Sequence, residues 1–188
     1  MKIVVLGDSL SAGFGLPADS AFPARLAVAL QKKNLAANVV NAGVSGDTAS
    51  GGLGRLDWSV PNGTDAVILE LGANDALRGI DPQLTKAALD KILGKLEARR
   101  IVVLLAGMRA PRNMGADYVR AFDGIYPALA STHAVVFYLF FLEGVAADAK
   151  LNQADGMHPN VAGVDVIVAR IMPQVETLIS RARAARGS

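Results

Sequence analysis

The chain of 188 residues contains no cysteine and only two histidines. The absence of cysteine excludes disulfides, thiolate zinc sites and cysteine nucleophiles. No apolar run approaches the roughly 20 residues needed to cross a membrane. The net charge is only +2, and the arginines near the C-terminus (Arg181, Arg183 and Arg186) are too few for a nucleic-acid footprint. We therefore expect a protein without a membrane span that does not bind nucleic acid.

The length is that of one domain, so we expect a single domain over residues 1–188 with a tag or disordered tail from about residue 184. Gly187-Ser188 is typical of a cloning remnant. The apolar run Ile3–Leu6 is too short for the core of a signal peptide. The compartment therefore stays open: periplasmic or secreted if a leader has been removed, cytoplasmic otherwise. For the oligomeric state we expect a monomer or a weak dimer.

Short β-branched runs alternate with longer helical patterns along the chain. Strands are predicted at Ile3–Leu6, Val39–Val40, Ala66–Leu71, Ile101–Leu105 and Ala134–Tyr138. Helices are predicted at Pro23–Lys33, at Asp81–Arg99, at Ala116–Ser131 with a bend at Pro127, and at Asn160–Ala185. Continuous apolar strands alternating with helices favour an α/β fold with right-handed crossovers. We expect a three-layer α/β/α sandwich, flavodoxin-like, with a central parallel sheet of about five strands.

Ser9 is the first candidate for chemistry, because it follows the first predicted strand in Gly7-Asp8-Ser9. Ligands of such folds bind outside the carboxyl ends of the strands. A hydrolase that lacks cysteine needs serine or threonine as its nucleophile. Gly-Asp-Ser is also a common sequence where a strand ends and a turn begins. Ser11, Ser45 and Ser50 are weaker candidates, since they lie farther into loops.

His158 is the candidate base, and it lies in Asp155-Gly156-Met157-His158-Pro159. A carboxylate three residues before it in a tight loop can reach Nδ1 and leave Nε2 free to take a proton from serine. The same segment can equally be a turn that starts a helix capped by Asn160. The other histidine, His133, has no carboxylate neighbour in the sequence, and a structural or solvent-exposed role is expected for it.

Two further residues at predicted strand ends suit the stabilisation of an oxyanion. Gly43 closes Asn41-Ala42-Gly43 after the second strand, and Asn74 lies in Gly72-Ala73-Asn74-Asp75 after the third. A glycine lets a backbone N–H approach a substrate, and an asparagine amide can donate to developing negative charge. Both are also common turn residues. Together with the N–H of Ser9 they would supply three donors.

Taken together, these four segments resemble the SGNH hydrolases, also called GDSL esterases. The family pattern is matched in order by Gly7-Asp8-Ser9-Leu10, Gly43, Gly72-Ala73-Asn74-Asp75 and Asp155-Gly156-Met157-His158. The likeness spans Ile3 to about Ile179 and is strongest to small bacterial multifunctional thioesterase/lysophospholipases and arylesterases. It implies Ser9 as nucleophile, His158 as base, Asp155 as orienting acid, and Ser9, Gly43 and Asn74 as oxyanion donors.

The resemblance implies a serine esterase that forms an acyl-serine intermediate and needs no metal and no organic cofactor. Its expected partner is a small ester or thioester with a short to medium acyl chain, and lysophospholipids are further candidates. Loops around 76–80 and 108–117 would border the acyl chain. The residues expected there are apolar: Leu77, Ile80, Met108, Pro111, Met114 and Met157. Two alternatives are an SGNH carbohydrate O-acetylesterase and a non-catalytic flavodoxin-like module that binds phosphate or another ligand.

Overall fold

A single parallel sheet forms the centre of the computed structural model, which describes residues 1–35 and 37–186. Its strands are β1 (Lys2–Gly7), β2 (Asn38–Gly43), β3 (Ala66–Glu70), β4 (Val102–Ala106) and β5 (Val136–Tyr138). They lie in the order β2-β1-β3-β4-β5, and every pair is parallel. This is the flavodoxin-like strand order. The predicted fold class and strand number are confirmed.

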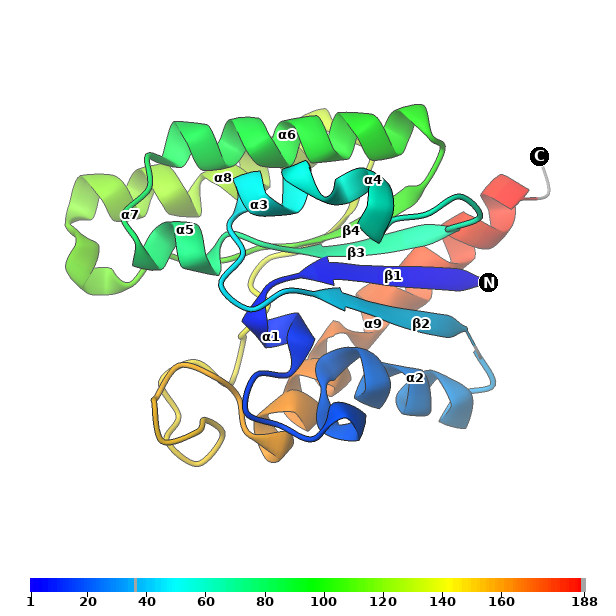
Figure 1. Ribbon diagram of the computed structural model, residues 1–188, viewed down its shortest axis with the longest axis horizontal. Coiled ribbons are helices and arrows are strands. Elements are labelled where there is room, and N and C mark those ends of the chain that lie inside the picture. The colour runs from blue at the N-terminus through cyan, green and yellow to red at the C-terminus, as the bar shows by residue number, and fades with distance from the viewer. Residues whose placement is uncertain (36, 187–188) are drawn as a thin grey trace.

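Helices cover both faces of the sheet and make three layers (Figure 1). One layer contains α1 (Ser9–Ala12), α2 (Phe22–Lys32) and α9 (Val161–Arg186). The other contains α3 (Ala49–Gly54), α4 (Leu56–Ser59), α5 (Ala73–Leu77), α6 (Pro82–Ala98), α7 (Ala116–Asp123) and α8 (Ile125–Thr132). Two short 3₁₀ helices, η1 (Ala18–Ser20) and η2 (Arg112–Met114), lie in connecting loops.

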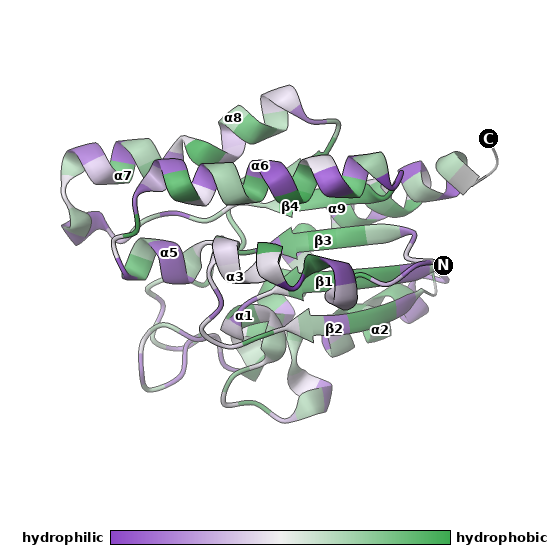
Figure 2. Cartoon of the chain, turned by 45° about the horizontal axis from the view of Figure 1, so that its top comes forward, coloured by the Kyte–Doolittle hydropathy of each residue, from purple (hydrophilic) through white to green (hydrophobic). Residues whose placement is uncertain are grey.

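The inner strands form because their residues are apolar on both faces. The side chains of Ile3–Leu6 in β1 are completely buried, and so is all of β3. Figure 2 shows these strands as the most hydrophobic part of the chain, with polar residues on the outer faces of the helices. By contrast, β2 is a half-exposed edge strand. It is longer than the predicted Val39–Val40, because pairing with β1 sets its length from Asn38 to Gly43.

The two longest predicted helices begin where their capping residues indicate. Asp81 accepts a hydrogen bond from the backbone N–H of Gln83 at 2.8 Å, and Pro82 is the first residue of α6. Asn160 likewise accepts from the N–H of Gly163 at 3.0 Å at the start of α9. Such caps satisfy N–H groups that have no partner within the helix.

The prediction of one helix over Ala116–Ser131, bent at Pro127, is wrong. The structure has two separate helices, and α7 ends at Asp123. The reason is the ring of Pro127, which in a continuous helix would clash with the carbonyl group four residues earlier, that of Asp123. In α8 the same proline lies in the first turn, where its missing N–H costs nothing.

The last helix has the predicted length but is shifted by one residue, from the predicted Asn160–Ala185 to Val161–Arg186. It continues to Arg186, beyond residue 184, where the sequence predicts that a tail begins. Gly187-Ser188, the expected cloning remnant, lies outside the described residues.

Candidate active site

The candidate nucleophile lies at the carboxyl edge of the sheet. Ser9 is the first residue of α1, directly after β1, and Asp8 caps that helix by accepting from the N–H of Leu10 at 2.9 Å. The turn between strand and helix is tight: a Cβ on Gly7 would lie 2.2 Å from Ser11 Oγ. A side chain at position 7 would have to displace the side chains of Ser11 and Glu70.

Ser9, His158 and Asp155 come together although they are far apart in sequence. His158 Nε2 lies 3.0 Å from Ser9 Oγ, and its Nδ1 lies 2.6 Å from Asp155 Oδ2. The loop before α9 is shaped by Gly156, whose φ is +69°. Asp155 Oδ1 accepts from the backbone N–H groups of Met157 and His158 at 2.9 and 3.0 Å. These are hydrogen-bond distances suited to proton transfer from a hydroxyl to an oriented imidazole.

The Asp155 carboxylate is stabilised in its charged form. The N–H groups of His158 and Met157 and the imidazole of His158 lower the pKa of Asp155 to about 2. At any pH near neutrality this residue is therefore an anion beside the imidazole. It can orient the ring and stabilise an imidazolium that forms during a reaction.

Phe14 is a site residue that sequence reasoning missed. Its ring centroid lies 4.5 Å from that of His158, and half of its surface is exposed. The residue lies between Gly13 and Gly15, both with positive φ. An aromatic residue between two turn glycines is the signal that could have found it. Its contact limits the space in which the imidazole can move.

The register of the sheet brings the expected oxyanion donors to the same edge as Ser9. Gly7 pairs with Gly43 on one side and with Glu70 on the other, four residues before Asn74. In this structure these donors have protein acceptors. The N–H of Gly43 donates to Asn41 Oδ1 at 2.9 Å. Asn74 Nδ2 donates to Asp8 Oδ2 at 3.1 Å and to the carbonyl of Asp47 at 2.9 Å.

Two buried carboxyl groups lie beneath the nucleophile. Burial raises the pKa of Asp8 to about 6, against hydrogen bonds from Leu10 and Asn74 that lower it. Burial and the nearby charge of Asp8 raise the pKa of Glu70 well above its ordinary value. Glu70 Oε2 accepts from Ser11 Oγ at 2.6 Å. Glu70 thus keeps its proton at pH values where exposed carboxyl groups have lost theirs.

Arg55 locks the two strand ends that frame the site, and no sequence signal pointed to it. Its guanidinium is buried and donates to the carbonyl oxygens of Gly7 and Ala42, both at 2.8 Å. It also forms an ion pair with Asp47, whose carbonyl accepts from Asn74. One side chain therefore connects the end of β1, the end of β2 and the loop that holds the amide.

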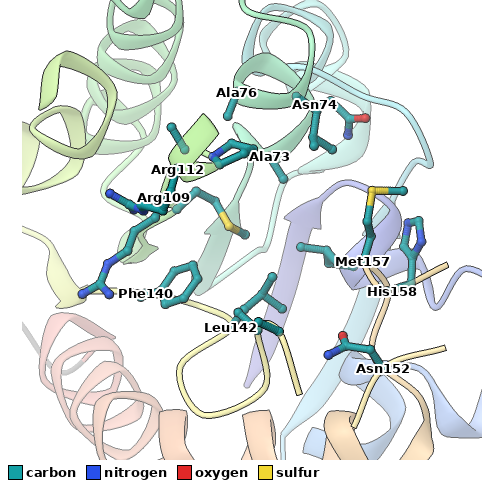
Figure 3. A pocket seen from close by; sticks show the side chains of 18 of the residues that line it. Ala73, Asn74, Ala76, Arg109, Arg112, Phe140, Leu142, Asn152, Met157 and His158 are labelled. Carbon is teal, nitrogen blue, oxygen red and sulfur yellow. The ribbon is translucent and has the colours of Figure 1, made fainter. Parts of the chain in front are cut away.

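A cavity of about 820 Å³ opens beside Ser9 and His158 (Figure 3). Four of the residues expected to border an acyl chain line it: Leu77, Met108, Pro111 and Met157. Ile80 and Met114 do not line this cavity. The carbonyl of Ile80 accepts from the hydroxyl of Tyr118, and Met114 packs near Gly79. Lining residues that the sequence did not indicate include Arg109, Leu139, Phe140 and Leu142.

The alternative serines and the second histidine do not line the cavity. Ser11 and Ser50 belong to α1 and α3 and not to loops, and Ser11 is buried. His133 has no carboxylate neighbour in the sequence, but the fold gives it two. His133 Nε2 lies 2.9 Å from Asp90, and Nδ1 lies 3.1 Å from Glu97, both carried by α6. Burial lowers the pKa of His133, but the hydrogen bonds to these two carboxylates outweigh it and raise the pKa.

The described part of the chain lacks two kinds of feature. Residues 1–35 and 37–186 hold no cluster of three or more His, Asp or Glu side chains that could bind a metal ion. The helices of these residues include none long and apolar enough to cross a membrane.

Comparison with known proteins identifies the family. Residues 5–166 match the GDSL-like lipase/acylhydrolase family. The chain belongs to this family. It is 37% identical over 178 residues to "Esterase TesA" of Pseudomonas aeruginosa, covering 94% of this chain and 89% of the relative. It is 40% identical over 179 residues to "Thioesterase 1/protease 1/lysophospholipase L1" of Escherichia coli K12, covering 95% and 85%.

The fold agrees with this assignment. The crystal structure of AlinE4, an SGNH-hydrolase family esterase, is 44% identical and superimposes with a TM-score of 0.80, covering 94% of this chain and 95% of that one. The resemblance inferred from the four sequence segments is therefore confirmed, and the chain is a hydrolase of carboxylic esters from the SGNH family.

Proposed function

We propose that this serine esterase acts through an acyl-serine intermediate, with Ser9 as nucleophile, His158 as general base and Asp155 as orienting acid. The observation that carries the proposal is the continuous line of hydrogen bonds from Ser9 Oγ through the imidazole to the Asp155 carboxylate, at 3.0 and 2.6 Å. A family match alone would not say which serine reacts.

In the first half of the reaction, Ser9 Oγ attacks the carbonyl carbon of the ester while its proton passes to His158 Nε2. The carbonyl oxygen becomes an oxyanion. When the tetrahedral intermediate collapses, the bond to the leaving group breaks and the imidazolium gives its proton to the departing oxygen or sulfur. In the second half, His158 takes a proton from water, the hydroxide attacks the acyl carbon, and Ser9 regains its proton as the acid departs.

The N–H groups of Ser9 and Gly43 and the amide of Asn74 are the donors for the oxyanion in this proposal. Asn74 is aimed by Asp8 Oδ2 and by the carbonyl of Asp47, which hold both of its N–H bonds. An oxyanion has to share these N–H groups with Asp8 and Asp47, or take the place of one of these two acceptors. Donors that are fixed before the reaction stabilise the transition state without reorganisation.

The cavity supports a short to medium acyl chain as the substrate group. Its volume of about 820 Å³ lies within the range of pockets that enclose small organic ligands. Leu77, Met108 and Phe140 are among its apolar walls. An O-acetylesterase for carbohydrates is less well supported, because an acetyl group does not need an apolar space of this size. A rate panel of aryl esters from acetate to decanoate, with a thioester included, measures the chain-length preference.

The assignment of the nucleophile is tested with Ser9→Ala, and Ser45→Ala serves as the matched control in an exposed loop. We expect Ser9→Ala to lower the turnover of a neutral aryl ester by roughly 10⁴-fold or more and to abolish covalent labelling by a fluorophosphonate. Its melting temperature should stay close to that of the wild type, since only one oxygen is lost. Labelling that persists in Ser9→Ala, or that is lost in Ser45→Ala, would refute the assignment.

A further inference from the structure

The cavity wall carries more positive than negative side chains, and one of the positive side chains has no ion-pair partner among the described residues. Among the lining residues, Arg109 and Arg112 are the cations and Asp123 is the carboxylate. Asp123 is already engaged, because Oδ2 pairs with Arg112 at 2.8 Å and Oδ1 accepts from the N–H of Ala110 at 2.9 Å. Within the described residues, Arg109 forms no ion pair with any carboxylate. The wall therefore carries an uncompensated positive charge.

Arg109 is held in place by a contact that leaves its hydrogen-bond donors free. Its guanidinium carbon lies 4.9 Å from the centroid of the Phe140 ring, in a cation–π contact. Within the described residues the Arg109 side chain donates no hydrogen bond, so its N–H groups are available to a ligand. A planar fork of this kind matches a carboxylate or a phosphate with two parallel hydrogen bonds.

Arg109 lies on the side of the cavity opposite His158 (Figure 3). Figure 3 shows Arg109 and Arg112 across the cavity from Met157 and His158, with Phe140 beside Arg109. Figure 3 shows Ala73 and Leu142 between these two sides, and Met108 is a further apolar residue of the lining. A ligand that reaches from His158 to Arg109 thus needs a reactive carbonyl at one end, an apolar middle part and a negative charge at the other end.

We propose that Arg109 is the anion-binding residue of this active site and that the preferred substrates are esters or thioesters that carry a second, anionic group. The inference rests on the proposed function, since it places the scissile carbonyl at Ser9. The anion has two possible origins in the substrate. It can be a carboxylate at the far end of the acyl chain, or a phosphate on the leaving group.

Two matched pairs of substrates distinguish these origins. The first pair is p-nitrophenyl octanoate and the mono-p-nitrophenyl ester of suberic acid, which differ by a terminal carboxylate. The second pair is octanoyl-pantetheine and octanoyl-4′-phosphopantetheine, which differ by a phosphate on the leaving group. The measured quantity is the ratio of kcat/KM for the charged substrate to that for the neutral one.

Arg109→Gln removes the charge, Arg109→Lys keeps it without the planar fork, and Arg120→Gln is the control. Arg120 is also an exposed arginine, but it lies on α7 outside the cavity wall, paired with Asp117. A hydrogen-bonded charge pair at a half-open site is worth on the order of tenfold in binding. We expect Arg109→Gln to lower the charged-to-neutral ratio about tenfold in at least one pair, mostly through KM, and Arg109→Lys to lower it less.

The pair that responds identifies the origin of the anion. The preference should also weaken as salt is added, because the site is exposed to solvent. The inference would be overturned if the charged-to-neutral ratio were the same in the wild type, Arg109→Gln and Arg120→Gln for both pairs. It would also be overturned if Arg120→Gln lowered this ratio as much as Arg109→Gln does. If the wild type failed to hydrolyse the neutral esters, or if Ser9→Ala hydrolysed them normally, the proposed function itself would fail, so the two failures are distinguishable.

Discussion

Replacement of Gly43 by alanine tests how closely β2 and α1 must approach for catalysis. A Cβ at this position would lie 2.3 Å from the N atom of Ala12, 2.7 Å from its Cα and 2.9 Å from the carbonyl oxygen of Asp8. All three atoms belong to the backbone around Ser9, so no side chain can turn away to make room. The shortest contact has to open by about 1 Å to reach the 3.4 Å at which ordinary contacts begin.

This displacement separates the proposed oxyanion donor at residue 43 from the proposed nucleophile on α1. A misplacement of 1 Å in an active site costs about 10²-fold in rate. The loss of one oxyanion donor costs on the order of 10²–10³. We therefore expect Gly43→Ala to lower kcat about 10²-fold with little change in KM. Overpacking of this kind also lowers the free energy of unfolding by about 1–3 kcal/mol.

The assay is steady-state hydrolysis of a neutral aryl ester, combined with thermal unfolding. Gly94→Ala is the matched control, because Gly94 lies inside α6 and a Cβ there meets nothing within 4 Å. That variant should keep full activity and gain about 0.5–1 kcal/mol of stability. If Gly43→Ala kept the wild-type kcat and melting temperature, the close approach would not matter and the reasoning would be refuted.

Three further predictions concern the amide and the two histidine clusters. Asn74→Ala should lower kcat by about 10²-fold or more at nearly constant KM, and a loss of affinity alone would contradict the oxyanion role. Asp155→Asn should cut the rate by about 10⁴-fold, because the imidazole loses the carboxylate that orients it; a rate close to that of the wild type would count against the pairing with His158. His133→Gln should leave the activity and its pH profile unchanged. The pKa of His133 is raised in the folded state, so its positive charge stabilises the fold below pH 6.5, and this stabilisation is lost as the pH rises through the raised pKa. The melting temperature of the variant should therefore fall furthest below that of the wild type near pH 5–6, and the difference should shrink at alkaline pH.

The sequence was informative wherever the structure depends on local preference. The β-branched runs located β1, β3 and β4, and the capping residues located the starts of α6 and α9. The order of the four motif segments pointed to the family because each segment follows a strand end or precedes a helix. The edge strand β2 was predicted too short, since pairing with β1 and not residue preference sets its length.

Interactions between distant residues could not be predicted from one sequence. The partners of His133 lie on α6, 43 and 36 positions earlier in the chain, and no sequence pattern near residue 133 predicts them. The buried clamp made by Arg55 and the bond from Asn74 to Asp8 are equally non-local. Ile80 was expected at the cavity because its loop is adjacent in sequence, but apolar character alone does not say which side of a loop faces the substrate.

The order in which a ribosome makes this chain has a consequence for when it becomes active. Ser9 emerges with the first strand, whereas His158 is joined to it across 149 positions by the last loop before α9. In the proposed mechanism, a nascent chain that has not reached residue 158 holds a nucleophile without a base and is therefore inactive. Parallel strands with distant pairing form slowly, while helices form early. Ester hydrolysis by this protein thus indicates that the fold is complete. When the denatured protein refolds, this activity should return later than the circular-dichroism signal of the helices.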